Sequence, residues 1–382
     1  MTPAQQNATA KALAARMGFT SSGIALVPAD GMAPRADSLA AWLEQGFHGP
    51  LAYMQKTHVA RSQIRTRFSW VRAVLALGAF YEGDTGQARR LSCCRTGILP
   101  VRQAGSLSHH VARYASGRDY HLVFRKRLKQ LARALVAEGV CSRAHWHVDT
   151  GPVLERAWAE AAGLGWIGKN ACLIHPQFGS FFLLAEILMD SAPAPDAPIP
   201  NRCGTCRRCL DACPTHALVA PGTLDARLCL ATWNIECRGA TPPQLWPAQR
   251  DYVFGCDTCQ AVCPYNAPRS TGVPPVPGAR HERDARATAD PELAAPRPWR
   301  QTTLAQCITM SQSEYNRAFA ASPLRRAGLK GLRLNAITVA GNLKSEDCRE
   351  ALRQCLADKD ADIRQRAEWA SGQYSTKGAW RV

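Results

Sequence analysis

The residues best suited to do chemistry in this chain are cysteines that recur at short, regular intervals. A first run has four cysteines two or three residues apart and ends on a proline: Cys203, Cys206, Cys209, Cys213 and Pro214. A second run repeats the last three cysteines of that pattern, again before a proline: Cys256, Cys259, Cys263 and Pro264. This spacing is typical of bacterial ferredoxins, in which the cysteine before the proline binds the neighbouring [4Fe-4S] cluster.

The crossed pattern predicts two clusters and a ligand set for each. One cluster is expected on Cys203, Cys206, Cys209 and Cys263. The other is expected on Cys213, Cys256 and Cys259 with a fourth ligand from between the runs, for which we favour Cys229 over Cys237. Structural zinc also binds four cysteines, but it does not require a crossed pattern with a proline after the last cysteine. Two adjacent clusters predict that electrons are delivered to another group in the protein.

Three further patterns are weaker. Asp149 follows a predicted strand and precedes a glycine and a helix, where catalytic groups gather but helix caps are also common. The glycines of Gly163-x-Gly165-x-x-Gly168 match a dinucleotide fingerprint by letters, yet they follow a predicted helix instead of opening one, so we expect a close backbone approach there. The vicinal pair Cys93-Cys94 has no third ligand nearby.

Composition limits the class of protein. The chain has 382 residues and 16 cysteines, with 47 Lys and Arg against 30 Asp and Glu, so its formal charge of +17 favours a polyanionic partner such as nucleic acid. No apolar stretch reaches the ~20 residues that a membrane span needs, and the N-terminus does not resemble a secretion signal. We therefore expect a soluble protein in a reducing compartment, with its clustered cysteines as metal or redox ligands.

The elements that must position these residues alternate along the first half of the chain. Helices are predicted at 3–17, 121–138 and 152–162, and buried strands at 23–27, 71–78, 146–149 and 179–188, which together indicate an α/β domain over 1–195. The segment 86–110 has no clear period and is expected to be an unusual loop. A proline-rich connector at 191–200 leads to the cysteine-rich domain, predicted at 196–270.

The second half is expected to end in helices. Residues 271–321 are predicted as an irregular connector because the stretch 266–298 is rich in Pro, Arg and Ala without a period. Residues 322–382 carry helical spacing at 326–343, 348–357 and 363–370 around an Asp-rich turn, which is typical of a HEAT-like repeat module. The fold class is thus α+β multidomain.

Several longer motifs, taken together with the cysteine runs, resemble the epoxyqueuosine reductase family. They are Val148-Asp149-Thr150-Gly151-Pro152, the stretch from Ala159 to Asn170, and the stretch from Ala112 to His121. The resemblance covers nearly the whole chain. It implies a cytoplasmic, cobalamin-dependent iron–sulfur oxidoreductase that reduces epoxyqueuosine to queuosine at the wobble position of tRNA, the last step of queuosine biosynthesis. It also implies a cobalamin-binding α/β domain akin to that of reductive dehalogenases, a ferredoxin-like domain with two [4Fe-4S] clusters, and the HEAT-like module.

The resemblance also implies roles for particular residues. Asp149 matches the family's proton donor, and Cys229 matches its remote cluster ligand. The positions that match cobalamin contacts are Arg61, Ala112, Asp149, Leu173, Ala231 and Asp257, with Lys169 and Asn170 close by. Two features depart from the family: the loop 86–110, and Ala231, where the family usually has Ser. Expected partners are tRNAs for Tyr, His, Asp and Asn and an external electron donor such as a flavodoxin or ferredoxin, with the protein acting as a monomer.

Basic residues provide candidates for phosphate contacts with RNA: Arg113, Arg118, Arg125, Lys126, Lys129, Arg325, Arg326, Lys330 and Arg333. Two other functions are weighed against this one. A corrinoid reductive dehalogenase of small molecules should carry a twin-arginine export signal and no HEAT-like tail. A non-catalytic, ferredoxin-type electron carrier would leave the first 190 residues without a role.

Overall fold

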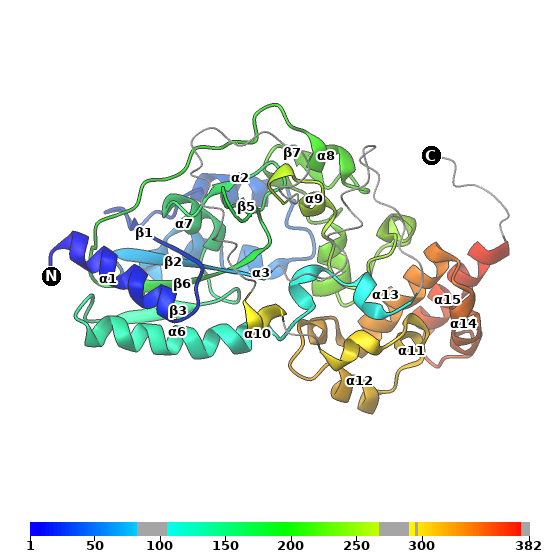
Figure 1. The fold of residues 1–382 in the computed structure, drawn as a ribbon. Helices are drawn as coiled ribbons and strands as arrows, with labels where there is room; N and C mark the ends of the chain where they lie inside the picture. Colours follow the sequence, from blue (N-terminus) through cyan, green and yellow to red (C-terminus); the bar gives the residue numbers. More distant parts are fainter. Residues whose placement is uncertain (82–104, 267–289, 295–296, 376–382) are drawn as a thin grey trace.

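The computed structural model describes residues 1–81, 105–266, 290–294 and 297–375. Within them, a sheet with its helices, a cysteine-rich region and a helical C-terminal region follow one another across the molecule (Figure 1). The predicted loop 86–110 lies mostly outside the described residues, and Cys93 and Cys94 lie entirely outside them. Within the described ranges, no helix is both long and apolar enough to cross a membrane.

The N-terminal region is built on a four-stranded sheet in the order β1-β2-β6-β3. Its strands are β1 (Ser21–Leu26), β2 (Ala73–Phe80), β3 (Ala144–His147) and β6 (Phe182–Met189). All four predicted strands are present, but every pairing is antiparallel, with Ile24 opposite Leu75 and Leu75 opposite Ile187. The order of helices and strands along the chain predicted an α/β domain, but that order does not encode the direction of the strands. Strand β6 lies between β2 and β3 in the sheet, although it is the last of these four strands in the chain.

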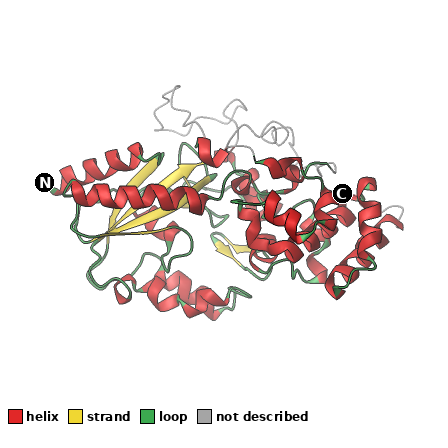
Figure 2. Cartoon of the chain, turned by 90° about the horizontal axis from the view of Figure 1, so that it is seen from below, coloured by secondary structure: helices red, strands yellow, loops and turns green. Residues whose placement is uncertain are grey.

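Helices cover both faces of this sheet. On one face lie α1 (Pro3–Arg16) and α6 (Tyr120–Ala137), whose Leu13, Phe124 and Leu128 share a core with Ile187. On the other lies α7 (Glu155–Ala161), which packs Trp158 against the alternate side chains of β2 and β6. Figure 2, seen from below, shows two long helices lying across the strands. Successive strand residues point to opposite faces, so one strand serves both cores.

Short elements complete this region. Between β1 and β2 lie α2 (Ala36–Glu44), α3 (Ala52–Lys56), α4 (His58–Ser62) and η1 (Ile64–Thr66). Before α6 lie η2 (Leu107–His110) and η3 (Arg113–Ala115), and after α7 come β4 (Trp166–Ile167) and β5 (Leu173–Ile174). The glycines at 163–168 follow α7 and precede β4, opposite to the order of a dinucleotide fingerprint. A side chain at Gly165 would lie only 2.2 Å from the Ile174 carbonyl oxygen, so the predicted close approach is present.

The cysteine-rich region consists of short pieces. They are α8 (Arg208–Ala212), β7 (Leu218–Ala220), β8 (Thr223–Leu224), η4 (Thr232–Glu236), η5 (Pro243–Leu245), η6 (Pro247–Gln249), α9 (Thr258–Ala261) and η7 (Pro264–Asn266). Helices α8 and α9 each begin within a cysteine run. The connector before this region runs back along α1 and β1, where Asp196 accepts hydrogen bonds from Ile24 N at 2.9 Å and from Asn7 Nδ2 at 3.2 Å.

The C-terminal region is helical and starts earlier than predicted. Its elements are α10 (Pro291–Ala294), η8 (Pro298–Gln301), α11 (Leu304–Thr309), α12 (Gln312–Ala318), η9 (Pro323–Ala327), α13 (Gly328–Leu343), η10 (Glu346–Cys348), α14 (Arg349–Cys355) and α15 (Ala361–Ser375). The prediction of an irregular connector over 271–321 is wrong for 304–318. Thr303 and Ser311 form capping boxes there, and Ile308 and Tyr315 join the core around α13. The three later helices are where we predict them, and their HEAT-like character stays a prediction.

The C-terminal core reaches across the predicted domain boundaries. Val111 from the N-terminal region and Phe254 from the cysteine-rich region are completely buried in the same cluster as Ile337 of α13. The Ala112 amide donates to the Phe254 carbonyl at 2.8 Å. All three regions therefore meet near residues 110–115, just before the start of α6.

Candidate functional site

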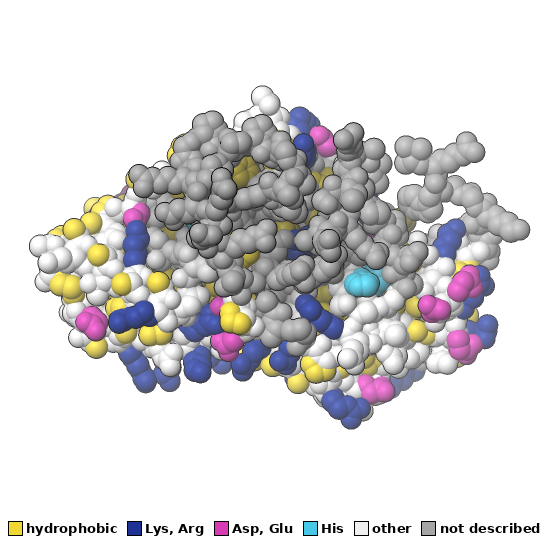
Figure 3. Space-filling model, in the orientation of Figure 1, with side chains coloured by type: hydrophobic (Ala, Val, Ile, Leu, Met, Phe, Trp, Pro, Cys, Tyr) yellow, Lys and Arg dark blue, Asp and Glu magenta, His cyan; other side chains and the backbone are white. Residues whose placement is uncertain are grey.

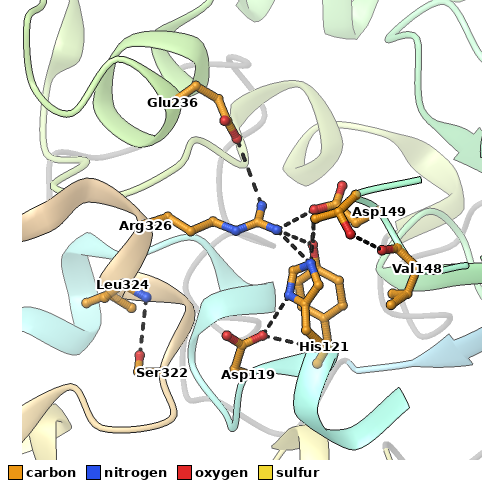
Figure 4. Close-up of polar contacts among 10 residues, drawn as sticks. Asp119, His121, Val148, Asp149, Glu236, Ser322, Leu324 and Arg326 are labelled. Carbon is orange, nitrogen blue, oxygen red and sulfur yellow. Dashed lines mark hydrogen bonds and ion pairs between the residues drawn. The ribbon is translucent and has the colours of Figure 1, made fainter. Parts of the chain in front are cut away.

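Asp149 lies where the three regions meet. It follows β3 with a φ of 55°, in the left-handed region that most residues avoid. Its Oδ2 accepts hydrogen bonds from Tyr120 Oη at 2.9 Å and His121 Nε2 at 3.2 Å, both at the start of α6, and from Arg326 Nη2 (Figure 4). Three donors thus converge on one carboxylate that is still 40% exposed.

The imidazole of His121 bridges two carboxylates. Asp119 caps α6 by accepting from the His121 amide at 3.0 Å, and its same oxygen contacts His121 Nδ1 at 2.8 Å. Burial lowers the pKa of His121, but the hydrogen bonds to Asp119 and Asp149 outweigh it, so the pKa is raised above its usual value. Burial likewise opposes the charge on Asp149, while the His121 hydrogen bond and the charge of Arg326 hold its pKa well below the usual range.

Arg326 comes from the C-terminal region, in η9. Besides Asp149, its Nη2 donates to Tyr120 Oη at 3.3 Å and lies 2.8 Å from His121 Nε2. Its Nη1 lies 3.9 Å from Oε1 of Glu236 in η4, and its guanidinium lies 5.8 Å from the centre of the Tyr120 ring. Figure 4 shows the guanidinium between the two carboxylates. We predicted Arg326 as a phosphate contact. Nothing in the local sequence signals that it reaches an aspartate 177 residues earlier in the chain.

Behind the Asp149 loop lie further acidic groups that sequence analysis missed. The Asp149 amide donates to Glu155 Oε1 at the start of α7. Glu186 of β6 is completely buried, and neither of its oxygens has a hydrogen-bond partner among the described residues. Burial raises the pKa of both carboxyl groups, and the charge of Asp149 adds to both shifts. Arg61, 8% exposed, donates to the Val153 carbonyl at 2.9 Å near the same loop.

The four cysteines predicted for one cluster surround a single pocket of about 250 Å³. It is lined by Cys203, Cys206, Cys209 and Cys263, together with Lys169, Asn170, Ile174, Arg202, Arg208, Pro264 and Tyr265. A single metal ion needs far less space than this. Asn170, one of the lining residues, is 4% exposed, and its Nδ2 has no acceptor in the described part of the chain. Lys169 and Asn170, which the family resemblance places close to the cobalamin contacts, line this pocket.

The cysteines predicted for the other cluster also lie together. Burial raises the pKa of the Cys256 thiol to about 12, and the nearby Cys229 thiol adds to this rise. Cys213 acts in the same way on Cys229. For Cys237, the alternative ligand, burial and the charge of Glu236 raise the pKa to about 11, and no cysteine of the described residues contributes to this shift. Among the two candidates, only Cys229 is therefore grouped with the second run.

A fifth thiol, that of Cys172, joins this second group. It forms a hydrogen bond with Cys259, which together with burial and the neighbouring thiols raises the pKa of Cys259. Sequence analysis missed Cys172 because it lies 31 residues before the first run, next to β5. Chain folding alone brings it to the cluster-binding segment.

Of the positions expected to contact cobalamin, several lie around Tyr114. The Arg113 amide, directly after Ala112, donates to Asp257 Oδ2 at 2.8 Å. Burial raises the pKa of Tyr114 beyond its usual range, and Asp149 and Asp257 both add to the rise, so both carboxylates lie near the phenol. The Tyr114 ring lies 6.2 Å from the rings of Tyr120 and Phe254, so it stands between the start of α6 and the segment just before Cys256.

The basic residues expected to contact RNA differ in their surroundings. Arg113 is buried, 4.3 Å from the centre of the Phe181 ring. Arg118 pairs with Glu292, Lys330 with Asp360 and Asp362, and Arg333 with Asp358. The remaining exposed ones are Arg125, Lys126, Lys129 and Arg325. In Figure 3, Lys and Arg side chains gather along the lower edge, over α6.

Family models, related sequences and a solved structure each match this chain. Residues 61–150 match the family model described as "Epoxyqueuosine reductase QueG, DUF1730", and residues 202–266 match "4Fe-4S double cluster binding domain". The epoxyqueuosine reductase of Gloeobacter violaceus is 41% identical over 338 residues, which cover 87% of this chain and 94% of the relative. That of Xanthomonas campestris pv. campestris is 35% identical and covers 97% of both chains. A crystal structure of an epoxyqueuosine reductase with a tRNA-Tyr epoxyqueuosine-modified stem loop is 27% identical with a TM-score of 0.77, covering 98% of this chain and 92% of that one.

Proposed function

The chain belongs to the epoxyqueuosine reductase family, and from that premise we propose how its residues carry out the family's reaction. The enzyme is an oxidoreductase that reduces epoxyqueuosine to queuosine in tRNA. Converting an epoxide to an alkene breaks two C–O bonds and consumes two electrons and two protons, and the oxygen leaves as water. The chain must therefore provide an electron route and a proton donor at one site.

The electron route begins at the two groups of cysteines. We assign one [4Fe-4S] cluster to Cys203, Cys206, Cys209 and Cys263, and the other to Cys213, Cys229, Cys256 and Cys259. The shared pocket of the first group and the unpaired N–H of Asn170, which lines it, favour a cluster, because cluster sulfurs accept hydrogen bonds that adjust the reduction potential. When bound, the clusters supply single electrons from an external donor such as a flavodoxin or ferredoxin.

Cobalamin is the cofactor that we place between the clusters and the substrate. Its proposed contacts are Arg61, Ala112, Asp149, Leu173, Ala231 and Asp257. The argument for fit is that Tyr114 packs against both Tyr120, which donates a hydrogen bond to Asp149, and Phe254, which lies just before Cys256 and Asp257. When bound and reduced, cobalamin supplies low-valent cobalt as the reductant of the epoxide.

The observation that carries the proposal is the set of donors around Asp149. Its carboxyl group is the proposed proton donor to the departing epoxide oxygen, because it is partly exposed and lies within hydrogen-bond distance of His121. His121 lies 3.2 Å away with a raised pKa and can return a proton to Asp149. Tyr120 fixes the orientation of the carboxylate from the same helical turn.

The proposed substrates are tRNAs for Tyr, His, Asp and Asn that carry epoxyqueuosine. We place the enzyme in the cytoplasm, because its substrate tRNA is found there and its thiols must stay reduced. We also propose that it acts as a monomer. The exposed cations of α6 and Arg325 are the proposed phosphate contacts. The formal charge of +17 supports an RNA partner.

The test is anaerobic purification with cobalamin supplied, followed by iron, sulfide and cobalt analysis and turnover of epoxyqueuosine-containing tRNA with a chemical reductant. We expect about eight iron atoms and one cobalt per chain, and conversion to queuosine that Asp149→Asn abolishes while both metals remain bound. Iron without cobalt under every condition would indicate an electron carrier. Turnover of small organohalides in place of tRNA would indicate a dehalogenase.

A further inference from the structure

The proposed acid is held in its ionised state by a residue from another part of the chain. Asp149 accepts hydrogen bonds from Arg326, Tyr120 and His121 on a single oxygen. A carboxylate beside a guanidinium and two further donors keeps its negative charge. A general acid must instead carry a proton when the bond to oxygen breaks. The arrangement described here is therefore a resting state, and Arg326 must leave before Asp149 can act.

Arg326 is placed so that it can leave. Its side chain is 28% exposed, and its second carboxylate partner, Glu236, is at 3.9 Å, too far for a strong hydrogen bond. Two other basic residues of the same region differ. Arg333 donates to the Ile308 carbonyl and to Asp358, both at 2.7 Å, and Lys330 lies between two aspartates. The Nη2 of Arg326 contacts Asp149, Tyr120 Oη at 3.3 Å and His121 Nε2 at 2.8 Å, so its close partners in the described chain are the proposed acid and the two residues that hold it.

The substrate brings groups that can compete for this cation. An RNA stem-loop carries a phosphate at every nucleotide, and a guanidinium binds phosphate through two parallel hydrogen bonds. Arg325, the adjacent residue, is exposed and adds positive charge at the same place. A phosphate that reaches η9 therefore meets two arginines, one of which is occupied by Asp149.

We propose that Arg326 exchanges partners when substrate RNA binds, leaving Asp149 for a phosphate of the RNA and so allowing Asp149 to take up the proton that it delivers. The proton passes to Asp149 from His121, which regains one from solvent. Arg326 is a positioning residue, since it acts on the reaction through Asp149. The arrangement keeps the acid ionised until the correct substrate is in place. This inference rests on the proposed function.

The exchange makes Asp149 and the RNA competitors for one guanidinium, which can be tested by binding alone. The probe is a stem-loop RNA with epoxyqueuosine at its wobble position. It is titrated into the oxidised holoenzyme, which cannot turn over, at several salt concentrations. Asp149→Asn removes the competitor and should bind the probe about three- to tenfold more tightly. Arg326→Ala should bind several-fold more weakly, with a plot of log K against log salt that is shallower by about 0.7–0.9, the loss of one phosphate contact.

The decisive comparison is the double variant. In the Arg326→Ala background, Asp149→Asn should give no gain in affinity, because the exchange no longer exists. Arg325→Ala is the matched control: it also removes an exposed arginine of η9, but the gain from Asp149→Asn should persist. Arg326→Lys, which keeps the charge, should retain the salt dependence and reports that the segment is folded.

Either of two results would overturn the inference. If the gain from Asp149→Asn persists without Arg326, it reflects only the removal of a negative charge near RNA. If Arg326→Ala leaves the salt dependence unchanged, no phosphate replaces Asp149. Wild-type turnover with a chemical reductant is measured alongside. Absence of both binding and turnover refutes the proposed function, whereas normal turnover with an additive double variant refutes the exchange alone.

Discussion

The backbone N–H of Asp149 donates a hydrogen bond to the carboxyl group of Glu155, six residues later at the start of α7. This contact closes the loop between β3 and α7 while Asp149 is in the left-handed backbone region. The proposed acid is therefore oriented from two sides. Side chains of α6 and η9 hold its carboxylate, and Glu155 holds its backbone.

Substitution of Glu155 tests this second support. Burial and the charge of Asp149 raise the pKa of Glu155, so glutamine resembles its protonated form. We expect Glu155→Gln to keep turnover within about threefold. Glu155→Ala leaves the Asp149 amide without its acceptor, which costs about 1–3 kcal/mol, or about 5- to 160-fold in kcat/KM. Equal effects of the two substitutions in single-turnover assays would show that the hydrogen bond does not support the reaction.

The raised pKa of His121 predicts how stability changes with pH. Protonated His121 is favoured in the folded state by Asp119 and Asp149. Its contribution is therefore fully present below the unfolded pKa of about 6.5 and is lost as the pH rises through the higher folded value. We expect His121→Gln to lower the thermal unfolding midpoint more at pH 5.5 than at pH 8.5. Gln6→Ala serves as the control because it removes an uncharged hydrogen bond, from Gln6 Nε2 to the Val140 carbonyl, and its effect should not depend on pH. An equal loss for His121→Gln at both pH values would contradict the assignment.

The grouping of thiols predicts which cysteines hold iron. Cys229→Ser should lower the iron content from about eight to about four atoms per chain, because it removes a ligand of one cluster. Cys237→Ser should leave about eight. Cys172→Ser should also leave about eight, since four other thiols already serve that cluster, but it should change the electron paramagnetic resonance spectrum by removing the neighbour of Cys259. Loss of iron in Cys237→Ser with full iron in Cys229→Ser would reverse the assignment.

Arg333 and Lys330 are expected to differ in their effects on stability. Arg333, 18% exposed, joins α11 to the turn before α15 through Ile308 and Asp358. Removing a well-bonded, partly buried arginine leaves those partners unsatisfied, so Arg333→Ala should cost about 2 kcal/mol and lower the unfolding midpoint by several degrees. Lys330 is half exposed, and Lys330→Ala should cost less than about 1 kcal/mol. If Arg333 instead binds RNA, Arg333→Ala would change the salt dependence of RNA binding with little effect on the midpoint.

The sequence by itself determined the elements and the ligand chemistry. The spacing of apolar residues predicted the four strands of the sheet and helices α1, α6, α7 and α13. A helix with one buried face and a fully buried strand each show a characteristic spacing of apolar residues along the chain. Cysteine spacing predicted two groups of thiols, because cysteines two or three residues apart within one run can reach the same cluster and the cysteine before the proline reaches the neighbouring one. The motif around Asp149 pointed to the proposed acid through its resemblance to a family. Strand direction and the helices at 304–318 were not readable, the first because alternation is the same in either direction and the second because those helices are short.

Only the tertiary structure decided which distant residues meet. Arg326 reaches Asp149 across 177 residues, Cys172 joins Cys259, and Val111 and Phe254 share the core of α13. No local pattern encodes such contacts, since each depends on how separate elements pack. The same packing assigned the basic residues. Arg113 is buried and Arg333 forms an ion pair with Asp358 inside the C-terminal region, whereas Arg125 and Lys129 are exposed on α6. Spacing along a chain specifies neighbours within a turn or a strand, and the charge state of the proposed acid depends on a guanidinium that only the folded chain brings to it.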